Sequence, residues 1–76
     1  MKVKIKESSH TKEHYGSNWE INFAGYTGEY KGNTVYFDKK SKEKLPKGWI
    51  KEGEKLGFDP YAYVVMEEDV EVIDEN

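Results

Sequence analysis

Short runs in which polar and apolar residues alternate constrain the fold of this chain more than any other feature of its sequence. Residues 2–6 read Lys-Val-Lys-Ile-Lys, residues 19–24 read Trp-Glu-Ile-Asn-Phe-Ala, and residues 70–73 read Val-Glu-Val-Ile. A period of two is typical of a β-strand that buries one of its faces. The alternation predicts that the inward side chains are those of Val3, Ile5, Trp19, Ile21, Phe23, Val70 and Val72.

Turn-forming residues mark a central hairpin, and a later apolar run adds one more strand. Gly32 and Asn33 lie between two β-prone runs within residues 29–37, a pattern typical of a hairpin. Residues 61–66, Tyr-Ala-Tyr-Val-Val-Met, are rich in aromatic and β-branched residues and predict a strand. The sequence therefore predicts five or six short strands in total.

Polar segments connect these predicted strands. Residues 7–18 and 51–57 contain glycine among mostly charged and polar residues and are interpreted as loops. Residues 38–48 are also highly charged, and Pro46 prevents a regular helix from passing through that segment, which is interpreted as a mobile loop that has room for one helical turn. We therefore expect no helix of ordinary length in the chain.

The length of the chain limits what it can enclose. Its 76 residues suit a single domain, residues 1–76, and a domain this small buries only about 60 % of the surface that its unfolded chain exposes. A deep cofactor pocket would occupy most of such a core, so no cofactor is expected. There is no cysteine and no long apolar run. We therefore expect a cytoplasmic protein without disulfides or a membrane span.

The order of these features resembles an SH3-like small β-barrel. In that family an acidic 3₁₀ turn often separates the last two strands, and the final strand pairs beside the first. Residues 63–73 look like that ending, residues 2–6 look like that opening strand, and residues 25–33 look like the central hairpin. The resemblance implies an all-β fold, namely a small SH3-like barrel of five to six strands with a short 3₁₀ turn before the last strand.

Two hallmarks of the peptide-binding SH3 family are missing from this sequence. It lacks the Ala-Leu-Tyr-Asp-Tyr start and the adjacent pair of tryptophans before the hairpin. Binding of proline motifs is therefore not implied. The sequence is more similar to SH3-like proteins of bacteria and their phages, which makes a phage or prophage origin our expectation.

No pattern of reactive side chains predicts catalysis. Cysteine is absent, no serine lies in a G-x-S-x-G motif, and neither a phosphate loop nor a dinucleotide fingerprint occurs. The run Glu67, Glu68 and Asp69 lacks the apolar setting that would raise a carboxyl pKa, so we expect it to be solvated. His10 and His14 have the spacing of a helical metal site, but their segment is interpreted as a loop. We expect neither a catalytic nor a metal site.

Aromatic residues are the strongest indication of a binding surface. The chain has eleven of them, which is more than a core of this size can hold. Trp19, Phe23 and Phe37 are the expected core aromatics. Exposed tyrosine and tryptophan either cover a thin core with their polar atoms in water or act as interface hot spots. The candidate binding residues are Tyr26, Tyr30, Tyr36, Trp49, Tyr61 and Tyr63.

Charge is distributed unevenly along the chain. Residues 39–55 carry seven lysines against three glutamates, whereas residues 56–76 carry seven acids and no base. Lysines beside aromatic residues are typical of single-strand nucleic-acid binding, but the net charge of −3 and the absence of arginine argue against it. The leading hypothesis is a non-catalytic module that binds an unidentified protein partner by occupying its surface. The alternative is a weak, non-specific nucleic-acid-binding domain whose basic rim comprises Lys31, Lys39, Lys40, Lys42, Lys44 and Lys47.

Overall fold

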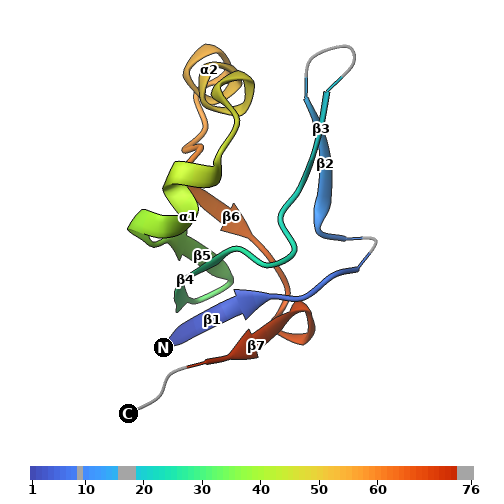
Figure 1. Ribbon diagram of the computed structural model, residues 1–76, viewed down its shortest axis with the longest axis vertical. Helices are drawn as coiled ribbons and strands as arrows, with labels where there is room; N and C mark the ends of the chain where they lie inside the picture. Colours follow the sequence, from blue (N-terminus) through green and yellow to red (C-terminus); the bar gives the residue numbers. More distant parts are fainter. Residues whose placement is uncertain (9, 16–18, 74–76) are drawn as a thin grey trace.

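The computed structural model describes residues 1–8, 10–15 and 19–73, with Tyr15 and Trp19 described by their backbone alone. The fold is mostly β, with two short α-helices added to the strands (Figure 1). The strands are β1 (Lys2–Ile5), β2 (Lys12–Tyr15), β3 (Trp19–Asn22), β4 (Thr27–Lys31), β5 (Thr34–Phe37), β6 (Ala62–Val64) and β7 (Val70–Val72). The helices are α1 (Lys39–Lys44), α2 (Lys47–Leu56) and the 3₁₀ helix η1 (Glu67–Asp69).

Five strands form one antiparallel sheet, and β2 and β3 form a separate hairpin. The order of the sheet is β6-β5-β4-β1-β7. β7 pairs with β1, so the last strand returns beside the first as predicted. η1 directly precedes β7, which confirms the predicted 3₁₀ turn. The sheet is open, because its outer strands β6 and β7 do not pair with each other in the described part of the chain.

The predicted central hairpin and the predicted late strand are both present. β4 pairs with β5, with Lys31 opposite Thr34 across the turn. Gly32 has a φ of 63°, a conformation that glycine adopts more readily than other residues. β6 is shorter than the predicted run of residues 61–66 and pairs with β5 alone among the described strands.

The alternation in β1 correctly predicts its buried face. Val3 and Ile5 are almost completely buried, and the lysines beside them are exposed. In β7 the prediction is wrong for Val72, which is 58 % exposed, while Val70 is half-buried. β7 is an outer strand, and its end at Val72 lies outside the hydrophobic core.

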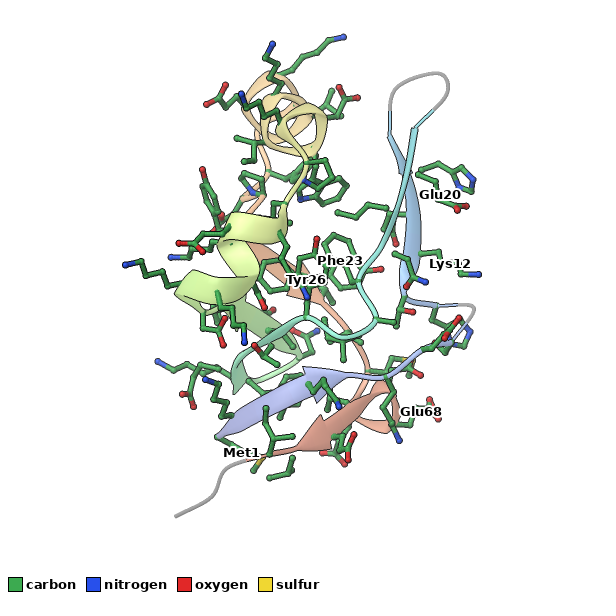
Figure 2. All side chains as sticks on the ribbon, in the orientation of Figure 1. Met1, Lys12, Glu20, Phe23, Tyr26 and Glu68 are labelled. Atoms are coloured by element: carbon green, nitrogen blue, oxygen red, sulfur yellow. The ribbon has the colours of Figure 1, made fainter. Side chains whose placement is uncertain are left out.

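Aromatic rings fill the centre of the core. Phe23 is completely buried and, like Phe37, belongs to the core as predicted. Its ring lies 4.1 to 5.6 Å, between centroids, from the rings of Tyr26, Phe37, Trp49 and Tyr63. Figure 2 shows Phe23 inside the molecule, whereas Lys12 and Glu20 point outward from the hairpin. The side chain of Trp19, the third predicted core aromatic, lies outside the described part of the structure.

Two segments interpreted as connections contain helices, and for residues 38–48 the short helix α1 agrees with the helical turn that the sequence allows there. α1 begins after Asp38, whose carboxylate accepts a hydrogen bond from the backbone N–H of Ser41 (2.9 Å) and caps the helix. Pro46 separates α1 from α2, so no single helix passes through it, as predicted. The expected loop over residues 51–57 is wrong, since α2 extends to Leu56. The hydropathy pattern does not reveal this helix, because one of its two buried residues is Gly53, which has no apolar side chain. No helix among the described residues is long and apolar enough to cross a membrane.

The predicted loop over residues 7–18 contains a strand. β2 pairs with β3 along its whole length, and the N–H of Phe23 donates to the carbonyl of the buried residue Thr11 (2.8 Å). The side chains described in β2 are all polar, so hydropathy does not reveal this strand, which is defined by backbone hydrogen bonds. Residues 9 and 16–18 of the predicted loop lie outside the described residues.

Candidate functional site

An open groove of about 680 Å³ lies between α2, the β6 edge of the sheet and strand β2 of the hairpin. Figure 1 shows that α2 and the hairpin extend from the same side of the sheet, of which β6 is an edge strand. Side chains from α2, β2, β5, β6 and the connection between α2 and β6 all line the groove. Segments far apart in the sequence therefore meet at this site.

Aromatic rings form the floor of the groove. The Tyr63 ring stacks on Phe23 with 4.1 Å between ring centroids, and Trp49 lies against Phe58 with 5.0 Å between centroids. The indole N–H of Trp49 donates a buried hydrogen bond to the carbonyl of Pro60 (3.0 Å). Because Trp49, Phe58 and Tyr63 all line the groove, its base is apolar and is fixed by contacts with the core.

Helix α2 forms one wall. Trp49, Glu52 and Leu56 line the groove, and their spacing of three and four residues places them on one face of the helix. Leu56 is 64 % exposed although it is apolar. The lysines of α2 recur at four-residue intervals on a different face, at Lys47, Lys51 and Lys55.

A glycine allows the chain after α2 to pack closely against this helix. A Cβ atom at Gly53 would lie 2.9 Å from Cδ of Pro60 and 3.0 Å from the carbonyl oxygen of Phe58. Gly57 then ends α2 with a φ of 85°. This close packing holds Phe58 and Asp59 at the edge of the groove.

Strand β2 forms the opposite wall and is joined to the floor by hydrogen bonds. The Tyr63 hydroxyl lies 2.7 Å from a carboxylate oxygen of Glu13 and 3.1 Å from the backbone carbonyl oxygen of His10, both of which accept from it. Burial raises the pKa of the Tyr63 hydroxyl, and its hydrogen bond to Glu13 and the charge of Glu13 raise that pKa further. The hydroxyl therefore remains a neutral donor at physiological pH.

The charged groups that line the groove are predominantly acidic. Glu13 comes from β2, Glu52 from α2 and Asp59 from the connection to β6. His14 also lines the groove, and its Nε2 lies 3.2 Å from a carboxylate oxygen of Glu20. No lysine is among the described residues that line the groove.

Three of the six predicted binding residues meet at this groove, which is lined by Tyr36, Trp49 and Tyr63. Tyr61 is exposed but does not line it, and the ammonium of Lys42 lies 5.7 Å from the centre of the Tyr61 ring. Trp49 lines the groove but also belongs to the hydrophobic core, since only 7 % of its surface is exposed.

Tyr26 and Tyr30 lie elsewhere. The expected exposure of Tyr26 is wrong, because its ring packs against Phe23 in the core and its hydroxyl donates to the carbonyl of Lys44 (3.1 Å). Tyr30 is half-buried, and its hydroxyl donates to the carbonyl of Val65 (2.9 Å). Both tyrosines attach neighbouring elements to the sheet and do not line the groove.

Sequence reasoning missed several residues of the site. The sequence pattern places Glu13, Glu52 and Leu56 in polar connections and does not single out Phe58. It places Val64 in a predicted strand without assigning it to a site. The one signal that was present is the spacing of Trp49, Glu52 and Leu56, which fits one face of a helix. The position of Glu13 had no local signal, because its partner Tyr63 lies fifty residues away in the sequence.

The two histidines have separate partners. Nδ1 of His10 lies 3.5 Å from Asp69, whereas His14 faces Glu20. Among the described residues there is no group of three or more side chains that could hold a metal ion. The expectation that Asp69 is solvated is wrong, because η1 turns its side chain inward and leaves only Glu67 and Glu68 of the acidic run exposed.

Helix α1 presents a second, basic surface. It carries Lys39, Lys40, Lys42 and Lys44. Buried Ser41 and the cap residue Asp38 fix the helix to the sheet, because the Thr27 N–H donates to Ser41 (2.8 Å) and the Thr27 hydroxyl donates to Asp38 (2.6 Å). Burial alone would raise the pKa of Asp38, but hydrogen bonds from Thr27 and Ser41 and the charge of Lys2 lower it to about 2.

Comparison of this chain with protein-family models, with curated proteins and with solved structures found no match. The chemistry of the groove and of the basic surface is therefore the basis on which a function is proposed.

Proposed function

We propose that this chain is a non-catalytic protein-binding module whose groove receives a peptide segment of a partner protein. The observation that carries the proposal is the open groove of about 680 Å³ with an aromatic floor. Ligand sites in proteins are typically concave and apolar, with a few polar groups, and have volumes of about 300–1,000 Å³. Aromatic side chains in such positions supply much of the binding energy at interfaces.

Exposed apolar side chains around the groove support this proposal. Leu56 and Val64 are each 64 % exposed, and Tyr36 is 47 % exposed. Scattered exposed apolar residues are ordinary, but these three come from α2, β6 and β5 and line the same groove. Covering them with a partner would remove apolar surface from water, which is favourable by about 25 cal/mol for each Å².

The polar groups of the groove favour binding over catalysis. The Tyr63 hydroxyl is hydrogen-bonded to Glu13, and its raised pKa keeps it protonated. The Thr34 hydroxyl donates to the side chain of Asn33 (3.2 Å), which is not a base. Neither serine nor cysteine is among the described residues that line the groove. Apart from the Tyr63 hydroxyl, which its raised pKa keeps protonated, no hydroxyl or thiol is paired with a general base among the described residues that line the groove.

The strand order supports the further proposal that this module is a variant of the SH3-like fold. The sheet has the order β6-β5-β4-β1-β7, and η1 precedes the last strand. In this view the β2–β3 hairpin is inserted between the first two strands of the sheet, and the two α-helices are inserted before β6. The hairpin and α2 form walls of the groove, and α1 precedes α2.

A displayed library of random linear dodecapeptides tests the proposed function. We expect selection on the purified protein to enrich peptides whose binding is lost in the Leu56→Lys variant and kept in the Val72→Lys variant. Both positions are exposed aliphatic residues, but Val72 lies in β7 and does not line the groove. Failure to enrich any peptide, or equal binding to the two variants, would contradict the proposal.

A second candidate function, nucleic-acid binding, is favoured by one observation on the basic surface. Lys42 lies above the exposed ring of Tyr61, which combines a cation with a stacking platform. If this surface binds single strands, fluorescent oligothymidine should bind at low salt, and its affinity should fall steeply with added salt. The absence of any anisotropy change at low salt excludes this second function.

A further inference from the structure

The outer edge of β6 is open to the groove. β6 pairs with β5 through the residues that face it, as in the hydrogen bonds from the Phe37 N–H to the Tyr61 carbonyl (3.0 Å) and from the Val65 N–H to the Asn33 carbonyl (2.9 Å). In an antiparallel pair the intervening residues direct their N–H and C=O groups away from the partner strand. The backbone groups of Ala62 and Val64 therefore face the other side, where no described strand pairs with β6.

The groove extends around this edge and reaches both faces of β6. Tyr63 lies on the face that contacts the core, and Ala62 and Val64 lie on the opposite face. All three residues line the groove. A chain segment that occupies the groove beside β6 would thus lie in the plane of the sheet next to this strand. Its backbone would face the β6 edge, and its side chains would contact residues on both faces of β6.

β6 is a short edge strand of three residues, but its side chains do not protect it. Natural edge strands are commonly guarded by shortness and by charged side chains, proline or bulges that discourage pairing with another chain. β6 consists of Ala62, Tyr63 and Val64 and carries neither a charge nor proline, whereas β7 at the other edge of the sheet carries Glu71. The β6 edge is therefore the one at which a partner strand is expected to pair.

The charge of the groove determines which segment fits it. Glu13 and Glu52 come from opposite walls, Asp59 lies at the edge, and the lysines of α2 lie on a different face of that helix. The aromatic rings that line the same groove suit the long aliphatic stems of basic side chains, whose charged ends can then reach a carboxylate. The groove is complementary to a cationic segment.

We infer that the occupant of the groove is an extended, lysine- or arginine-bearing segment of the partner that pairs as an added strand with β6. This inference rests on the proposed function and specifies its ligand. The basic side chains lie on the Tyr63 face between Glu13 and Glu52, and the alternate apolar side chains lie on the Val64 face beside Tyr36. Backbone hydrogen bonds to Ala62 and Val64 supply affinity, and the alternating side chains supply selectivity.

A fluorescein-labelled octapeptide of alternating lysine and valine is the probe for the charge of the ligand. We expect its affinity, measured by fluorescence anisotropy, to exceed that of the glutamate–valine octapeptide by about tenfold or more. The Glu52→Gln variant should weaken binding of the lysine–valine peptide. The matched Glu54→Gln variant should not, because Glu54 does not line the groove. Equal affinity for the two peptides overturns the cationic part of the inference.

Methylation of peptide nitrogens is the probe for strand pairing. Two further octapeptides carry N-methyl groups on every lysine or on every valine, and only one of these sets of amides can face β6. We expect one methylated peptide to bind about tenfold more weakly than the other. On the protein side, Val64→Pro removes an outward N–H and should weaken binding, whereas Val64→Ala keeps that N–H. Equal binding of both methylated peptides and the parent peptide overturns the strand pairing, whether or not Val64→Pro folds.

The outcomes separate this inference from the proposed function. If the random library yields groove-dependent peptides that lack basic residues, the proposed function stands and the inference fails. If neither the library nor the octapeptides bind, both fail. If sedimentation shows that the protein self-associates and that Val64→Pro abolishes this, the β6 edge is occupied by a second copy of the chain, and the basic partner segment is overturned.

Discussion

Helix α2 and strand β2 face each other across the groove, but they are attached to the rest of the molecule in different ways. α2 inserts the buried ring of Trp49 into the core and packs Gly53 against Pro60. β2 has no buried residue among its described side chains, since Lys12 and His14 are exposed and Glu13 is half-buried. It is attached through its ladder with β3, through the hydrogen bond between Glu13 and Tyr63 and through contacts with α2.

This difference predicts that the two walls open at different free energies. Burial of a large aromatic side chain contributes several kcal/mol, whereas a single hydrogen bond contributes about 1 kcal/mol net. We therefore expect α2 to separate from the core only on global unfolding, and β2 to open locally. The groove would then have one fixed wall and one that adjusts to the ligand.

The largest effect is expected from removing the anchor of α2. Trp49→Ala deletes the ring contacts with Phe23 and Phe58 and the hydrogen bond to Pro60, and should lower the free energy of unfolding by about 3–5 kcal/mol. On the opposite wall, His14→Ala removes an exposed contact with Glu20 and should change stability by about 0.5 kcal/mol or less. Urea denaturation of both variants measures the contrast, and similar losses would contradict it.

The next effect tests the close packing behind α2. Gly53→Ala places a Cβ against Pro60 and the Phe58 carbonyl and should destabilise the protein by about 1–3 kcal/mol, although alanine favours a helix. Gly48→Ala, at an exposed position of the same helix, should instead stabilise it by up to about 1 kcal/mol. Thermal or urea unfolding distinguishes the two signs, and a stabilised Gly53→Ala variant would show that this packing does not fix the wall.

A third variant loosens α2 from its N-terminal side, because Asp38 caps α1, which leads directly into α2. The pKa of Asp38 is lowered from 3.8 to about 2, so the unfolded state binds more protons between these values. The ionised Asp38 carboxylate therefore contributes about 1–2 kcal/mol to the free energy of unfolding, a value reduced because the group is partly exposed. This contribution is fully present above about pH 4 and is lost as the pH falls toward 2. The stability difference between wild type and Asp38→Asn should shrink over that range. A difference independent of pH would be inconsistent with the lowered pKa.

Those parts of the sheet with a buried face were predictable from the sequence. Val3 and Ile5 alternate with lysines, and this pattern located β1 and its buried face. The pairing of β1 with β7 was implied by the resemblance to SH3-like barrels. β2 was not predictable, because hydrogen bonds to β3 define it and its described side chains are polar. α2 was hidden because few of its residues are apolar and Gly53, one of its two buried residues, has no side chain to signal burial.

The candidate site was predictable only in part, for a related reason. Abundant aromatic residues in a short chain led to Tyr36, Trp49 and Tyr63, which do line the groove. The acidic walls could not be foreseen, because Glu13 and Glu52 acquire a common position only when the hairpin and α2 are placed on the same side of the sheet. Local sequence patterns contain no information about such a meeting of distant segments.

The smallest expected effect concerns the β2 wall itself. Tyr63→Phe keeps the stacking on Phe23 and removes the hydroxyl that donates to Glu13 and to the His10 carbonyl, so the free energy of unfolding should fall by only about 1 kcal/mol. Hydrogen exchange should nevertheless become faster in β2 than in wild type while the amides of α2 change little, because only the β2 wall loses an attachment. Equal acceleration in both walls would mean that α2 and β2 open as one unit, and the contrast between a fixed and an adjustable wall would be wrong.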